Sequence, residues 1–167
     1  MTITLIIYVK FFANTTIGCI IYKCCVGVFD WGMQMEEKKI LIVEDDPDNQ
    51  ELLKEIIDYC MPDYKYTAAC DGEDALIAAK KQEFDLIFMD MSVPKKNGYE
   101  ILTELRKSKN YMSVPIIALT AHTMDGTKEK ILDSGFDEYI AKPCNPKVLI
   151  DTIKKYLENK KKILFGA

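Results

Sequence analysis

The chain has 167 residues, of which 49% are hydrophobic and 29% are charged, and its formal net charge at pH 7 is -4. This length and balance are typical of one water-soluble domain with a core of ordinary size. The weakly acidic balance disfavours direct binding of nucleic acid, which needs clustered Lys and Arg. The chain has a single histidine, His122, so zinc sites built on several histidines are excluded and a Ser-His-Asp arrangement is limited to this residue.

The first 35 residues differ in composition from the rest of the chain. Residues 1–34 are rich in Ile, Phe, Cys and Val and carry only Lys10, Lys23 and Asp30 as charged side chains. The longest charge-free run, residues 11–22, is shorter than the ~20 residues of a membrane-spanning helix. We therefore predict an apolar N-terminal extension over residues 1–35 with no role in the fold, and Met35 is an alternative start. A membrane or interface anchor and a structured addition stay open as alternatives.

The cysteines indicate the redox environment. They stand at positions 19, 24, 25, 60, 70 and 144. None of them is spaced Cys-x-x-Cys, which excludes a zinc knuckle and a thioredoxin-like pair. We predict small buried thiols in a reducing, cytoplasmic location.

From Lys39 on, apolar runs of strand length alternate with segments of helical periodicity. The runs predict strands over residues 40–43, 66–69, 86–89, 115–119 and 139–141. The predicted helices begin at Pro47, at Gly72, near Ile101, at Lys128 and at Pro146. In the last helix, periodicity predicts five inward residues: Val148, Leu149, Ile153, Tyr156 and Leu157. Five strands alternating with five helices favour an α/β fold, with a doubly wound parallel sheet covered on both faces.

Polar residues follow the apolar runs at the carboxyl ends of four predicted strands. They are Glu44 and Asp45 after the first strand, Asp90 after the third, Thr120 after the fourth and Lys142 after the fifth. In open α/β sheets, ligands bind beyond these ends, so we expect the five side chains to meet at one edge.

Three carboxylates in one cleft repel each other. At ~5 Å and an effective dielectric of ~20, each pair costs roughly 3 kcal/mol. Mg²⁺ removes this repulsion, because it prefers oxygen ligands and is commonly held by carboxylates beside a phosphate. Lys142 and the hydroxyl of Thr120 suit phosphoryl oxygens, and carboxylates form acyl phosphates in enzymes. The pattern predicts a phosphoryl site beside Mg²⁺.

These residues stand in segments that together are highly specific. The segments are ILIVEDDP over residues 40–47, DLIFMDMSVP over residues 85–94 with Gly98, IIALTA over residues 116–121 and YIAKP over residues 139–143. From Lys39 to about Leu157 the sequence resembles the receiver domains of two-component response regulators. The resemblance implies a flavodoxin-like (βα)5 fold with strand order 2-1-3-4-5.

The resemblance also implies a role for each site residue. Asp90 would be the phosphoacceptor, and Glu44, Asp45, Asp90 and the backbone carbonyl of Ser92 would hold Mg²⁺. Thr120 and Lys142 would contact the phosphoryl group. Tyr139 would change rotamer together with Thr120, and the Lys142–Pro143 peptide bond would be cis. His122 is expected to be a solvated loop residue near the site rather than a general base.

The implied function is that of a phosphoacceptor in a phosphorelay. Residues 36–158 would form the receiver domain and residues 159–167 a short tail. The phosphoryl group would come from a histidine kinase or a histidine phosphotransfer protein, and a downstream protein target would receive the signal. Such a domain catalyses only its own phosphorylation and dephosphorylation. It would meet a membrane only if residues 1–35 are an anchor.

Two other classes of protein use a similar fold. A flavodoxin-like FMN electron carrier needs a Ser-, Thr- or Gly-rich phosphate loop after the first strand, where this chain has Glu44-Asp45-Asp46-Pro47. A haloacid-dehalogenase-like phosphatase also uses an aspartate nucleophile, but in the pattern Asp-x-Asp. Here residue 92 is Ser, so both alternatives are less favoured.

Overall fold

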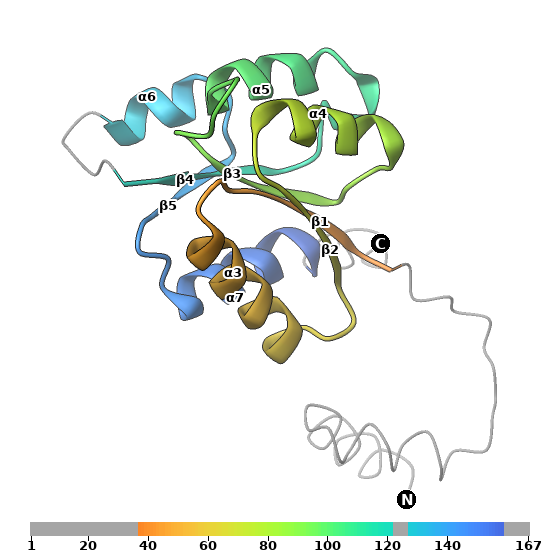
Figure 1. The fold of residues 1–167 in the computed structure, drawn as a ribbon, viewed down its shortest axis with the longest axis vertical. Helices are drawn as coiled ribbons and strands as arrows, with labels where there is room; N and C mark the ends of the chain where they lie inside the picture. Colours follow the sequence, from red (N-terminus) through yellow and green to blue (C-terminus); the bar gives the residue numbers. More distant parts are fainter. Residues whose placement is uncertain (1–36, 122–126, 159–167) are drawn as a thin grey trace, which may run out of the picture. The chain divides into compact units, whose positions relative to one another are not determined.

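The structure is a computed structural model that describes residues 37–121 and 127–158. Its sheet has the strands β1 (Lys39–Val43), β2 (Lys65–Ala69), β3 (Leu86–Asp90), β4 (Ile116–Thr120) and β5 (Glu138–Ala141). All neighbouring strands are parallel, in the order β2-β1-β3-β4-β5 (Figure 1). The predicted fold class and strand order are therefore confirmed.

Helices cover both faces of this sheet. They are α3 (Pro47–Cys60), α4 (Gly72–Lys81), α5 (Gly98–Arg106), α6 (Thr127–Asp133) and α7 (Pro146–Leu157), with a short 3-10 helix η1 (Lys109–Tyr111) that the sequence analysis missed. In Figure 1, α3 and α7 lie on one face, and α4, α5 and α6 lie on the other. The sheet is thus doubly wound, as predicted.

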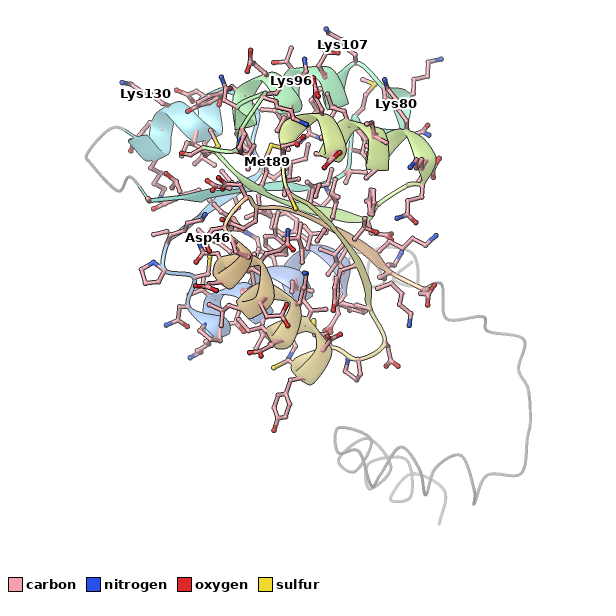
Figure 2. All side chains as sticks on the ribbon, viewed as in Figure 1. Asp46, Lys80, Met89, Lys96, Lys107 and Lys130 are labelled. Atoms are coloured by element: carbon pink, nitrogen blue, oxygen red, sulfur yellow. The ribbon has the colours of Figure 1, made fainter. Side chains whose placement is uncertain are left out.

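The core consists of two apolar layers, one on each face of the sheet. Successive residues of a strand point to opposite faces, so Leu41 and Met89 belong to one layer while Ile42 and Phe88 belong to the other. Figure 2 shows Met89 between the sheet and the helices α4 and α5. Every residue of β3 is buried, which explains why the run reads as continuously apolar up to Asp90.

One inward residue was predicted wrongly. Val148 is 47% exposed, whereas Leu149, Ile153 and Leu157 on the same helix are buried. Those three residues recur every four positions and form one stripe. Val148 precedes the stripe by one residue and therefore points away from the core.

The prediction of buried thiols is also wrong for two of the described cysteines. Cys60 and Cys70 are exposed, and Cys144 is half-buried. Cys60 ends α3, and Cys70 follows the edge strand β2, so both stand at element ends beyond the core.

The predictions about the N-terminal extension, His122 and the C-terminal tail concern residues that the structure does not describe. Residues 1–35, His122 and residues 159–167 lie outside the described residues. Within residues 37–121 and 127–158, no helix is both long and apolar enough to cross a membrane.

Candidate functional site

The site lies at the carboxyl edge of the sheet, where the strand register brings distant residues together. Asp90 and Thr120 are the last residues of β3 and β4, and both are buried, at 6% and 4% exposure. The amide of Lys142 donates to the carbonyl oxygen of Thr120 at 2.8 Å, which fixes the end of β5 beside the end of β4. Directly after β1, Glu44 is fully buried and Asp45 is exposed.

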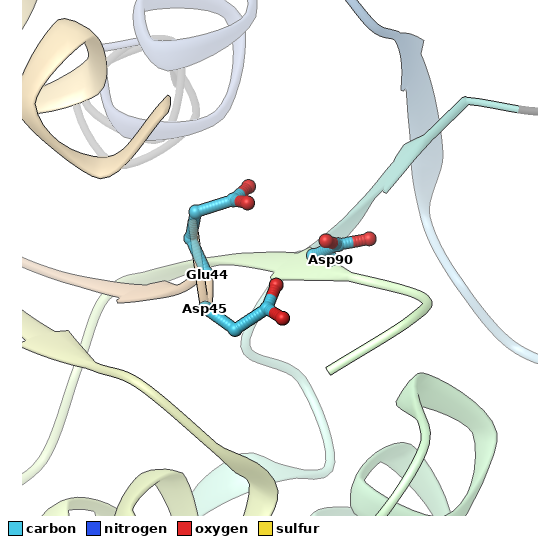
Figure 3. A group of neighbouring side chains, drawn as sticks. All are labelled: Glu44, Asp45 and Asp90. Carbon is cyan, nitrogen blue, oxygen red and sulfur yellow. The ribbon is translucent and has the colours of Figure 1, made fainter. Parts of the chain in front are cut away.

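Three carboxylates adjoin at this edge. Figure 3 shows Glu44 and Asp45 at the end of β1 and Asp90 at the end of β3. One carboxylate oxygen from each residue lies within 4.8 Å of the others. The structure therefore brings together three of the predicted metal ligands, although Asp90 follows the adjacent Glu44 and Asp45 by 46 and 45 positions in the chain.

Lys142 bridges two of these carboxylates. Its Nζ donates to Asp90 Oδ2 at 2.7 Å and to Glu44 Oε1 at 2.9 Å. The second oxygen of Glu44, Oε2, is 2.6 Å from the same Nζ. That contact lacks hydrogen-bond geometry, and Oε2 has no hydrogen-bond partner among the described residues.

The electrostatics of the site follow from burial and from this bridge. Burial raises the pKa of Glu44, and Lys142 partly opposes the rise. For Lys142, burial acts to lower the pKa, but the hydrogen bonds to Asp90 and Glu44 outweigh it, so the pKa is raised. Lys142 is therefore charged at neutral pH.

The residues fit a divalent cation. Lys142 supplies one positive charge against three carboxylates, and two of these carboxylates, Glu44 and Asp90, are buried. Carboxylate oxygens are the ligands that Mg²⁺ prefers. Glu44, Asp45 and Asp90 are the side chains that would hold it.

The loop after β3 folds back onto Asp90. The amide of Ser92 donates to Asp90 Oδ1 at 3.0 Å, which places Ser92 next to the carboxylate. Residues 91–97 form this loop, and we call it the acceptor loop. Val93, in the middle of the loop, is buried.

The predicted switch residues lie on the same face of the sheet. Tyr139 pairs with Ala118, two positions before Thr120, and packs half-buried against the layer under α4, α5 and α6. The Nζ of Lys128 lies 5.7 Å from the centre of its ring. Next to this strand, the Lys142–Pro143 bond is cis, as predicted.

Sequence reasoning missed two contacts of Glu44. The side chain of Asn49 donates to Glu44 Oε1 at 3.4 Å, and that of Gln50 donates to the Glu44 backbone carbonyl at 3.2 Å. Both residues stand near the start of α3. An amide side chain there is usually solvated, so only the packing of α3 against the sheet reveals the contact.

Comparisons with known proteins point to one family. The family model described as "response regulator receiver domain" matches residues 40–154 of this chain. A hybrid signal transduction histidine kinase of Dictyostelium discoideum is 37% identical over 143 residues, which cover 79% of this chain but 8% of that kinase.

Two solved structures are similar along most of their length. The receiver domain of the sensor histidine kinase PA1611 from Pseudomonas aeruginosa, with magnesium coordinated in its active site cleft, is 35% identical with a TM-score of 0.65, and the match covers 72% of this chain and 97% of that one. A co-crystal structure of the Saccharomyces cerevisiae phosphotransfer protein Ypd1 and the receiver domain of its downstream response regulator Ssk1 contains a chain that is 31% identical with a TM-score of 0.64. That match covers 72% of this chain and 88% of the other.

Proposed function

Because this chain belongs to the response regulator receiver domains of two-component and phosphorelay signalling, we propose that Asp90 is its phosphoacceptor. The observation that carries the proposal is the position of the Asp90 carboxylate. It lies at the end of β3, bonded to Lys142 at 2.7 Å, with oxygens of Glu44 and Asp45 within 4.8 Å. Nucleophile, cation and candidate metal ligands thus share one edge of the sheet.

The chemistry is transfer of a phosphoryl group between two nucleophiles. An oxygen of the Asp90 carboxylate attacks the phosphorus of a phosphohistidine, and the P–N bond breaks with its electron pair staying on the imidazole. Glu44, Asp45, Asp90 and the backbone carbonyl of Ser92 would hold Mg²⁺, which would supply positive charge to offset the negative charge of the transferred group. Lys142 Nζ donates to one phosphoryl oxygen and the Thr120 hydroxyl donates to another.

Labelling of the protein with radioactive phosphate tests the proposal directly. Incubation with radiolabelled acetyl phosphate and Mg²⁺ should give acid-labile, hydroxylamine-sensitive label, which is the behaviour of an acyl phosphate. Label that resists hydroxylamine would contradict an aspartyl phosphate.

The proposed partners follow from this chemistry. The phosphoryl donor is a histidine kinase or a histidine phosphotransfer protein, and a downstream protein target reads the phosphorylated surface. Two similarities support the donor classes, since one relative is a hybrid histidine kinase and one similar receiver domain was solved with a phosphotransfer protein. We further propose a cytoplasmic location and no turnover of external substrates.

The proposed domain is residues 36–158. Support comes from the start of β1 at Lys39, the end of α7 at Leu157 and the division of the chain between Glu36 and Glu37. All five strands lie inside this range. Residues 1–35 and 159–167 are proposed as additions on either side.

Mg²⁺ is expected to stabilise the folded domain. At ten times its dissociation constant, the ion should add roughly 1.4 kcal/mol to the free energy of unfolding by mass action. Thermal melts in EDTA and in excess Mg²⁺ measure the difference. Asp45→Asn should abolish it, because this variant removes an exposed ligand and leaves Glu44 and Lys142 in place. Coinciding melts of the wild-type protein would contradict the metal site.

Thr120 is expected to couple phosphorylation to Tyr139. Its hydroxyl should move toward a phosphoryl oxygen and leave room for the ring of Tyr139 to turn inward. One hydrogen bond is worth ~1 kcal/mol, or about a fivefold change in the ratio of two states. Thr120→Ala should therefore keep the label but reduce the NMR shift changes at Tyr139 and α7. Equal shift changes in wild type and Thr120→Ala would contradict coupling through Thr120.

A further inference from the structure

Lys95, in the acceptor loop, has an unusual backbone conformation. Its φ is 65°, the only positive φ of a non-glycine residue within residues 37–121 and 127–158. A side chain with a Cβ disfavours this left-handed region, which glycine adopts without steric cost. The backbone makes a tight turn at this residue, in which the amide of Lys96 donates to the carbonyl oxygen of Pro94 at 2.8 Å.

The side chain of Lys95 forms ion pairs at the start of α4. Lys95 Nζ lies 2.6 Å from Asp71 Oδ2 and 3.4 Å from Glu73 Oε2. The side chain of Asp71 is 12% exposed. Its other oxygen, Oδ1, accepts from the amides of Glu73 and Asp74 at 2.9 Å each and caps the helix. The lysine is thus bonded to a carboxylate that the helix itself holds in place.

The backbones of the acceptor loop and α4 also touch. The amide of Gly72 donates to the carbonyl oxygen of Pro94 at 3.2 Å. A Cβ on Gly72 would lie 2.6 Å from the Cβ of Lys96 and 2.8 Å from its carbonyl oxygen. Only glycine permits this approach, so the loop is seated against the first residue of the helix.

The same loop determines the surroundings of Asp90. Its second residue, Ser92, donates to Asp90 Oδ1, and its first residue, Met91, accepts from Gly98 at 3.2 Å. A shift of the loop away from α4 would therefore change where Ser92 meets the acceptor carboxylate.

We propose that Lys95 is a positioning residue: its ion pair with Asp71 holds the acceptor loop against α4 and thereby keeps Ser92 in place beside Asp90. The inference rests on the proposed function, because it concerns the metal and phosphoryl site at Asp90. The ion pairs of Lys95 are with Asp71 and Glu73 and not with the carboxylates of Glu44, Asp45 or Asp90. Its effect reaches them through the backbone of residues 91–95.

The test compares variants that remove the pair with variants that keep it. Lys95→Gln removes the charge and keeps most of the stem. Asp71→Asn removes the other charge and keeps the oxygen that caps α4. Lys95→Arg restores a cation, and Lys96→Gln removes one positive charge from the next position as the matched control.

Two measurements are made on the folded protein. The first is the Mg²⁺ dissociation constant, which an NMR titration measures. The second is the hydrogen-exchange protection of the Ser92 and Gly72 amides without Mg²⁺. Lys95→Gln and Asp71→Asn should each raise the dissociation constant about two- to fivefold, the range of a partly exposed ion pair. The double variant should be no worse than either single variant.

The remaining variants separate positioning from other effects. Protection of both amides should fall in Lys95→Gln and return in Lys95→Arg, and Lys96→Gln should match wild type. Unchanged Mg²⁺ affinity and protection in Lys95→Gln, with only a lower melting temperature, would overturn the proposal. Additive effects in the double variant would overturn it too. A wild-type protein that neither binds Mg²⁺ nor takes up phosphoryl groups would instead contradict the proposed function, and this inference with it.

Discussion

The Asp90→Asn variant is expected to take up no hydroxylamine-sensitive phosphate from acetyl phosphate or from a phosphohistidine donor. An amide is a far weaker nucleophile than a carboxylate, and no second carboxylate is held in the same position between Lys142 and Ser92. The fold should survive, because the Asn side-chain oxygen can still accept from the Ser92 amide. Loss of one of three mutually repelling carboxylates should also leave stability in EDTA unchanged or slightly higher.

The measurement is radiolabel per mole of protein, with circular dichroism as the check on folding. Asp151→Asn is the matched control, because Asp151 is an exposed aspartate on α7. It should label as the wild type does. Label at the wild-type level in Asp90→Asn would remove Asp90 as the acceptor, whereas loss of label in Asp151→Asn would indicate a nonspecific effect.

Replacing Lys142 by Met should have opposite effects on phosphoryl uptake and on Mg²⁺ binding. Uptake should slow by about 10- to 100-fold, because hydrogen bonds to a charged group contribute ~1.5–3 kcal/mol. Mg²⁺ should bind more tightly, since the cation at 2.6–2.9 Å from Glu44 no longer repels the metal or competes for the carboxylate oxygens. Single-turnover labelling and an NMR titration measure the two quantities.

The opposite signs make this prediction specific. A destabilised or misfolded variant would lose both properties together. Lys147→Met removes the same charge from an exposed position at the start of α7, so it should change neither. Faster or unchanged phosphoryl uptake in Lys142→Met would contradict the role given to this lysine.

The fold class and the location of the site are predictable from the sequence alone. Strands buried on both faces must be continuously apolar, so β1, β3 and β4 are visible as runs such as residues 40–43. The first polar residue after such a run marks the carboxyl end of the strand. Because parallel strands present these ends at one edge, Glu44, Asp90 and Lys142 could be assigned to one site before any contact was known.

The contacts within that site follow from the packing of the strands. Lys142 Nζ bridges Glu44 and Asp90 although the residues are 98 and 52 positions away in the chain. No local pattern encodes such a bridge, since it depends on the register of β1, β3 and β5. The exposure of Val148 likewise depends on the rotation of α7 about its axis, which is set by the packing of Leu149 and Ile153 against the sheet.

The contact between Lys95 and Asp71 illustrates the limit most clearly. In the sequence, Lys95 is one of two adjacent loop lysines, and Asp71 is a helix cap. Their ion pair requires the acceptor loop to lie against the first turn of α4. The loop can lie there only because residue 72 is a glycine, since a Cβ at this position would clash with Lys96. The hydrophobic pattern of each segment predicts which of its residues are buried. Contacts between polar side chains form only when packing brings distant segments close together, so the pattern of one segment does not predict them.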